Sequence, residues 1–378
     1  MKNTIGLYIH IPFCVKKCAY CDFCSYENAL SKRDDYIDAL CKEMSSYKEE
    51  LSSRIVDTIY VGGGTPSMLT PSQIIRLGNA IRENCNIAPD AEFTFEVNPQ
   101  SGISEIFAAA KEIGVNRISM GLQSADDRLL RIIGRSHDVR RFDECFDAAR
   151  SAGFENISLD LMTGLPSQTL SDLEASIDYA VSKKPEHISA YALKIEEGTP
   201  FHKIEDTLDL PDEDMETAMY HLMIERLKAY GYEQYEISNF ARDGFYSRHN
   251  TRYWLGQDYL GLGVSAHSYM NGERFYNEDS LDEYMSAVNE GRTPVCERDK
   301  IEGDELIEEY IMLRLRLKAG LDPADFENRF GISFEPFMKR CEPFIEKGLM
   351  QKNSKYIRLT PDGFLVSNYI ISDLILEI

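Results

Sequence analysis

Short β-branched apolar segments alternate with amphipathic segments through the first half of the chain. The apolar segments predict strands at 5–11, 56–61, 92–97, 115–120, 156–161 and 187–193. Apolar residues at helical spacing predict helices at 32–52, 71–84, 103–113, 138–152 and 170–183, with a short helix near 125–132. Each strand–helix repeat has the length of a βαβ unit, which implies a parallel sheet. Six repeats favour an α/β fold built as an open, partial (β/α)6 barrel over a closed eight-unit barrel.

The pattern changes after residue 200. A helix is predicted from about 212 to 230, followed by an aromatic-rich stretch at 232–277. From about 300, helices near 302–318, 322–330 and 335–347 precede strands near 349–358 and a last helix from 361, an order typical of a winged-helix-like fold. We therefore expect a barrel at 1–200, an extension at 201–299 that closes the barrel, and a small C-terminal domain at 300–378.

Charge and composition exclude some classes of function. The chain has 41 basic and 63 acidic residues, a net charge of −22, which repels phosphate backbones and makes nucleic acid an unexpected partner. No apolar run approaches the roughly 20 residues of a membrane-spanning helix. The first strand follows the N-terminus without a basic leader, so we expect a cytoplasmic protein.

Four cysteines lie within eleven residues near the N-terminus, at Cys14, Cys18, Cys21 and Cys24. Thiolates at the C-x3-C-x2-C spacing can converge on one iron–sulfur cluster, and three thiolates leave one iron open to a small molecule. A structural zinc site is the alternative, but the chain has no second cysteine or histidine pair of the kind such sites use. The spacing, with Tyr20 before the third cysteine, resembles that of the radical S-adenosylmethionine (SAM) enzymes.

Polar residues follow the predicted strands where each strand ends. Glycines occupy 62–64 after the second strand, and Glu96, Gln123 and Asp160 end the third, fourth and fifth strands. The sixth strand ends near 191–194. Because the carboxyl ends of parallel strands meet at one rim, we expect one binding site there, next to the cysteine cluster.

These motifs together resemble the oxygen-independent coproporphyrinogen III oxidase family, which includes heme chaperones. The resemblance rests on the segments 9–14, 62–66, 121–124, 134–136 and 160–166 and covers nearly the whole chain. It implies a [4Fe-4S] cluster held by Cys14, Cys18 and Cys21, with SAM on the open iron. It also implies cofactor-binding roles for Tyr8, Tyr20, Gly63, Gly64, Thr65, Glu96, Gln123, Arg135, Asp160 and Ala192. We interpret Cys24 as a non-ligand; the alternative is that it serves as another soft ligand.

Three features favour the chaperones of that family over its oxidases. The oxidases have a longer N-terminal extension, which we expect to be missing here because Cys14 comes almost at once. Residues 249–254 read His-Asn-Thr-Arg-Tyr-Trp and match a signature of the chaperones. His267 stands where the oxidases have an aliphatic residue.

The resemblance implies heme as a ligand and a heme-receiving apo-protein, such as a respiratory heme protein, as a partner. It also implies an electron donor for the cluster, and membrane contact only through a partner. Histidine is a common axial ligand of heme iron, so His249 is the first candidate and His267 the second. The alternative is that His249 and Trp254 simply pack and hydrogen-bond in the core. Decarboxylation of coproporphyrinogen III stays open as a competing function, as does a nucleic-acid-modifying activity that the charge disfavours.

Overall fold

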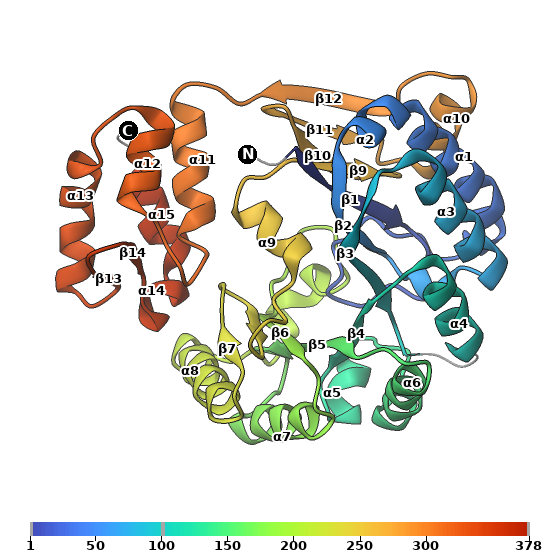
Figure 1. Ribbon diagram of the computed structural model, residues 1–378. Coiled ribbons are helices and arrows are strands. Elements are labelled where there is room, and N and C mark those ends of the chain that lie inside the picture. Colours follow the sequence, from blue (N-terminus) through green and yellow to red (C-terminus); the bar gives the residue numbers. More distant parts are fainter. Residues whose placement is uncertain (1–2, 100–102, 376–378) are drawn as a thin grey trace.

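The computed structural model describes residues 3–99 and 103–375. Its centre is a curved sheet in which six parallel strands follow one another in chain order, with helices on the outer face (Figure 1). These strands are β1 (Thr4–Ile11), β2 (Ile55–Gly63), β3 (Ile87–Val97), β4 (Arg117–Gln123), β5 (Asn156–Thr163) and β6 (His187–Ala192). The order of the strands confirms the predicted partial (β/α)6 barrel.

Side-chain caps mark the start of four of the barrel's helices. They are α1 (Arg33–Ser46), α2 (Lys48–Ser53), α3 (Pro71–Asn84), α4 (Ile103–Ile113), α5 (Asp127–Ile132), α6 (Val139–Ser151) and α7 (Leu170–Ser182), with 3-10 turns η1 (Leu30–Lys32) and η2 (Pro66–Met68). Helix α3 starts at a reciprocal pair of hydrogen bonds between Thr70 and Gln73, with Pro71 at its first position. The helix predicted at 32–52 is instead two helices, because the backbone at Tyr47 leaves the helical conformation.

The segment after β6 extends the sheet at both edges. It contains η3 (His202–Thr207), α8 (Glu213–Ala229), β7 (Glu233–Gln234), β8 (Asn239–Ala241), α9 (Arg248–Trp254), β9 (Tyr259–Leu262), β10 (His267–Met270), β11 (Glu273–Asn277), α10 (Leu281–Asn289) and β12 (Val295–Lys300). Strands β8 and β7 continue the sheet beyond β6, whereas β9 pairs in parallel with β1 and leads to the antiparallel strands β10 to β12. Helix α9 packs between β2 and the C-terminal part of the chain.

A buried glutamate fastens this extension to the first helix of the barrel. The carboxylate of Glu43, in α1, accepts hydrogen bonds from the Gly263 backbone N–H at 2.8 Å, from Asn277 Nδ2 at 2.6 Å and from the Tyr284 hydroxyl at 2.6 Å. Burial raises the pKa of Glu43 to about 7, although the three donors oppose that shift. The extension is therefore held against α1, next to the cysteine segment.

The C-terminal part has a hydrophobic cluster of its own, formed by residues between 307 and 374. It consists of α11 (Asp304–Arg314), α12 (Pro323–Phe330), α13 (Glu335–Glu346), the hairpin of β13 (Met350–Lys352) and β14 (Ile357–Leu359), α14 (Pro361–Leu365) and α15 (Ser367–Ile375). This is the order of elements that the sequence predicted, except that the last helix, predicted from 361, is two helices, α14 and α15. None of the helices within residues 3–99 and 103–375 is both long and apolar enough to cross a bilayer.

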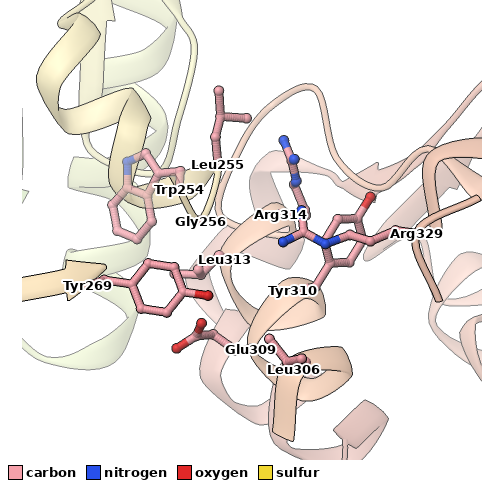
Figure 2. Close-up of a pocket in the computed structure, with 10 residues that line it drawn as sticks. All are labelled: Trp254, Leu255, Gly256, Tyr269, Leu306, Glu309, Tyr310, Leu313, Arg314 and Arg329. Atoms are coloured by element: carbon pink, nitrogen blue, oxygen red, sulfur yellow. The ribbon is translucent and has the colours of Figure 1, made fainter. Parts of the chain in front are cut away.

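Aromatic and charged side chains line the seam between this part and the extension (Figure 2). Trp254 and Tyr269 lie on one side, and Tyr310 and Arg314 lie on the other. The cavity between them measures about 10 Å³, which is room for about one water molecule. The seam is thus closed in this conformation.

Candidate functional site

A cavity of about 520 Å³ opens at the carboxyl ends of the parallel strands, within the size range of small-molecule sites. Its wall includes twelve of the residues that the sequence singled out: Cys14, Cys18, Tyr20, Cys21, Gly63, Gly64, Thr65, Glu96, Gln123, Arg135, Asp160 and Ala192. Tyr8, His249 and His267 do not line it. The structure therefore brings the cysteines and the strand ends together, as expected from the parallel topology.

The cysteine segment is a loop that leaves β1 and is tied back at its base. The Cys14 N–H donates to the Tyr26 carbonyl at 3.2 Å, and the Tyr26 N–H donates to the Pro12 carbonyl at 2.7 Å. Cys24 lies outside the cavity wall, with its sulfur 3.8 Å from the Tyr26 hydroxyl and 3.6 Å from the Asp279 carbonyl oxygen. Three thiols of the loop thus face the cavity and the fourth faces the extension.

The three cavity thiols suit a cluster better than a single ion. Among residues 3–99 and 103–375, no three Cys, His, Asp or Glu side chains are placed to hold one metal ion together. A [4Fe-4S] cluster does not need such convergence, because each thiolate binds a different iron. Burial raises the pKa of Cys14 and Cys21, which favours the protonated thiols, whereas a bound metal cation would favour the thiolates.

Glycines at the end of β2 and directly after it let the cysteine loop approach the sheet closely. A Cβ atom on Gly64 would lie 2.9 Å from the Ile11 carbonyl oxygen, and one on Gly63 would lie 2.4 Å from the His10 ring. Gly63 also has a φ of 108°, which side chains other than glycine rarely adopt. The glycine run is therefore needed to form this wall of the cavity.

His10 fixes the far end of the cysteine loop. Its Nε2 lies 2.8 Å from the Cys24 carbonyl oxygen, which can only accept, so Nε2 carries the proton. Nδ1 then accepts from the Tyr8 hydroxyl at 2.9 Å, so Tyr8 contacts His10 and does not line the cavity. Burial lowers the pKa of His10 to about 4, so this arrangement holds at neutral pH.

A chain of hydrogen bonds links two of the cavity cysteines around the rim. Arg135 Nη1 lies 3.6 Å from the sulfur of Cys18, and Arg135 Nη2 donates to Asn98 Oδ1 at 2.8 Å. Asn98 Nδ2 donates to Thr65 Oγ1 at 2.8 Å, and that oxygen lies 3.4 Å from the sulfur of Cys14. The Nε atom of Arg135 is buried without a partner. Arg135 Nη2 also donates to the Gly121 carbonyl at 3.1 Å, so the guanidinium is held in the cavity wall, where its charge favours a ligand carboxylate.

Two carboxylates lie deeper in the cavity. Glu96 accepts from the Tyr60 hydroxyl at 2.6 Å and from the Gly63 N–H at 3.1 Å. Burial raises the pKa of Glu96 to about 7 and that of Asp160 to about 6, although part of each side chain is open to the cavity. Gln123 stands at a bulge in β4 with a φ of 67°, and its Oε1 accepts from the Tyr191 hydroxyl at 3.2 Å. These groups can accept hydrogen bonds from hydroxyl or ammonium groups of a ligand.

His249 does not fit the role of heme ligand in this structure. The side chain is fully buried, its Nδ1 lies 3.0 Å from Thr58 Oγ1, and its Nε2 lies 2.8 Å from the Tyr253 hydroxyl. Its ring also stacks on Tyr60, with centroids 5.3 Å apart. Neither ring nitrogen is available to iron, so the structure favours the alternative in which His249 packs in the core. Trp254, from the same motif, lines the closed seam of Figure 2.

His267 is exposed at the start of β10. Its ring stacks on Tyr276, with centroids 5.1 Å apart and an angle of 26° between the rings. The residue is therefore far more exposed than His249, which is fully buried. Of the two histidines that the sequence singled out, this one is open to a ligand.

Comparison with known proteins agrees with this geometry. Residues 8–180 match the radical SAM superfamily, and residues 301–366 match the HemN C-terminal domain. The heme chaperone HemW of Bacillus subtilis is 39% identical over 367 residues, which cover 96% of this chain and 97% of that protein. The chain belongs to the HemW family within the radical SAM superfamily.

Another HemW protein and the solved structure of an oxidase are also similar to this chain. The heme chaperone HemW of Escherichia coli is 32% identical, and the alignment covers 97% of both chains. The solved structure of the coproporphyrinogen III oxidase HemN from Escherichia coli, a radical SAM enzyme, has a TM-score of 0.88 at 27% identity and covers 100% of this chain and 91% of that chain. The fold is therefore common to chaperone and oxidase and does not distinguish them.

Several residues that line the cavity were not identified as site residues from the sequence. They lie on the rim and on the floor of the barrel: Asn98, Arg117, Ser119, Ser189, Tyr191, Asn239 and Asn250. Those on the six parallel strands or directly after them follow the two-residue period of inward-facing positions, for example Arg117, Ser119, Gly121 and Gln123 on β4. Asn239 and Asn250 come from the extension, and no local pattern assigns them to the cavity.

Proposed function

We propose that this chain is a heme chaperone that binds heme, a [4Fe-4S] cluster and SAM and passes heme to heme-receiving apo-proteins. The observation that carries the proposal is 39% identity across 97% of the heme chaperone HemW of Bacillus subtilis. The cavity supports the cofactor part, because three thiols and a polar rim face one another there.

In this proposal Cys14, Cys18 and Cys21 hold the cluster, and Cys24 does not. When both are bound, the cluster supplies reducing electrons to SAM at its open iron. Arg135 attracts the SAM carboxylate through its charge. Glu96 and Asp160 accept hydrogen bonds from the ribose or the ammonium group. Tyr20, Gly63, Gly64, Thr65, Gln123 and Ala192 shape the wall against SAM, and Tyr8 acts through His10 on the cysteine loop.

The heme contact is proposed at His267, because it is the accessible one of the two candidates and is stacked on an aromatic ring. We propose a cytoplasmic protein with a separate electron donor, which meets a membrane only through a partner. The barrel at 1–200 would hold the cluster and SAM, the extension at 201–299 would hold heme, and 300–378 would form a separate domain.

Anaerobically reconstituted protein tests the proposal against the oxidase alternative. Titration with heme should give a new Soret band that saturates at about one heme per chain. Incubation with coproporphyrinogen III, SAM and a reductant should leave the substrate unchanged. Decarboxylation of the substrate, with no heme uptake, would establish the oxidase function instead.

A further inference from the structure

Tyr26 connects the cysteine loop to the extension. Its backbone is bonded within the loop, because the Tyr26 carbonyl accepts from the Cys14 N–H at 3.2 Å and the Tyr26 N–H donates to the Pro12 carbonyl at 2.7 Å. Its side chain is bonded to the extension, where the hydroxyl donates to the Asp279 carbonyl and accepts from the Leu281 N–H at 3.1 Å. One residue thus contacts a proposed cluster ligand through its backbone and the extension through its side chain.

The groups that Tyr26 contacts lie in residues 278–281, which we call the β11–α10 turn. Leu281 is the first residue of α10, so its N–H has no carbonyl partner within that helix. The Tyr26 hydroxyl satisfies this N–H and also binds the Asp279 carbonyl just before the helix. The position at which β11 ends and α10 begins is therefore fixed from the cysteine loop.

The same turn is bonded to the backbone that leads to His267. The Glu278 carbonyl accepts from the Ser265 N–H at 2.7 Å. Ser265 stands two residues before His267 and has a φ of 56°, which residues other than glycine rarely adopt. A bond to the turn thus helps to hold an unusual backbone conformation at the start of β10, beside the proposed heme contact.

A second anchor of this region does not involve the cysteine loop. Glu43 of α1 binds Asn277 and Tyr284, which lie on either side of the β11–α10 turn. This anchor keeps the extension attached to α1 when the bonds of the Tyr26 hydroxyl are removed. The effect of Tyr26 on the turn can therefore be separated from the folding of the extension.

We propose that Tyr26 is a positioning residue that couples the cysteine loop to the β11–α10 turn, so that binding of the cluster orders this turn. A cluster held by Cys14, Cys18 and Cys21 ties three points of the loop to one group and removes conformational freedom from the loop. Tyr26 loses freedom with it, because its carbonyl is bonded to the Cys14 N–H. Its hydroxyl then holds a turn that opens less often. The inference rests on the proposed function for the cluster ligands and for heme at His267.

Hydrogen exchange of the amides of residues 277–284, followed by mass spectrometry on the whole chain, tests the coupling. Exchange is measured before and after anaerobic reconstitution with iron and sulfide. In the parent, reconstitution should slow exchange by about fivefold or more. In Tyr26→Phe, the two rates should agree within about twofold. A merely structural role would speed exchange equally in both states and leave their ratio as in the parent.

Tyr284→Phe is the matched control, because it removes a hydroxyl that holds the same segment to Glu43 and not to the cysteine loop. Exchange should be faster in both states of this variant, and the ratio between the states should stay that of the parent. A ratio in Tyr26→Phe equal to the parent's, or a parent in which reconstitution does not slow exchange, would overturn the coupling.

Iron and sulfide are measured on every variant, and Tyr26→Phe should match the parent because both of its backbone bonds remain. If this variant holds no cluster, the parent decides alone: helix α8, which packs on α7 and α14, should keep its exchange rate, and equal slowing there would overturn the coupling. A parent that binds no iron would refute the cluster and the coupling together. Loss of heme uptake with intact coupling would refute the chaperone function alone.

Discussion

Replacement of His249 by alanine distinguishes a packed histidine from a heme ligand. The imidazole is fully buried, and both of its nitrogens are hydrogen-bonded. His249→Ala removes the ring from its stack on Tyr60 and leaves the hydroxyls of Thr58 and Tyr253 buried without that partner. His267→Ala is the matched control, because that histidine is exposed.

The size of the effect follows from these contacts. Leaving a buried hydroxyl unsatisfied costs about 1–3 kcal/mol, and truncating a buried ring to alanine costs about 3–5 kcal/mol in all. We therefore expect His249→Ala to lower the free energy of unfolding by about 3–5 kcal/mol. An exposed substitution such as His267→Ala should change it by less than about 0.5 kcal/mol.

Urea unfolding followed by fluorescence measures the difference. The chain has one tryptophan, Trp254, and it lies on the same helix as His249. The midpoint for His249→Ala should fall with little change in the slope of the transition. With heme present, the Soret band should shift in His267→Ala. An unchanged midpoint for His249→Ala, together with a lost or shifted Soret band, would falsify the packing role of this residue.

Three further predictions concern the cysteine loop and the extension. Gly64→Ala should reduce iron content after reconstitution, because the added methyl group pushes the cysteine loop off the sheet; an iron content equal to the parent's would contradict the close approach. Cys24→Ala should retain iron and Cys18→Ala should lose most of it, as measured by iron and sulfide analysis; the opposite result would reverse the ligand assignment. Glu43→Gln should change how unfolding free energy depends on pH, as measured by urea unfolding between pH 4 and 8.

The sign of the last effect follows from proton binding. Burial raises the pKa of Glu43 to about 7 in the folded state, above its ordinary value of about 4.3. The folded state therefore binds this proton more tightly, and its stabilising contribution is lost as pH rises from about 4.3 to about 7. The glutamine variant lacks this titration. Its stability relative to the parent should rise over that range, and a constant difference would show that Glu43 does not titrate there.

The barrel could be predicted from the sequence because its signals are local. Helix α3 was placed at 71–84 by its apolar spacing, and Thr70, Pro71 and Gln73 set its start. The cavity followed from topology, since parallel strands bring Glu96 and Asp160 to one end of the sheet.

The strands of the extension could not be predicted, because they pair with strands that are distant in sequence. Strand β9 pairs with β1 across about 250 residues, and nothing in the aromatic-rich segment specifies that partner. The packing of His249 could not be predicted for the same reason. Thr58, which occupies its Nδ1, lies 191 positions away in sequence. Arg117 was missed because it begins an apolar strand and only the fold brings it to the cavity.

Heme transfer tests the central claim most directly. Protein loaded with one heme is mixed anaerobically with increasing concentrations of a heme-free b-type cytochrome, and the Soret band of the acceptor is followed. A chaperone that hands heme over by contact should give a rate that rises with acceptor concentration. A rate independent of acceptor concentration, equal to the rate of spontaneous heme loss, would contradict the chaperone function.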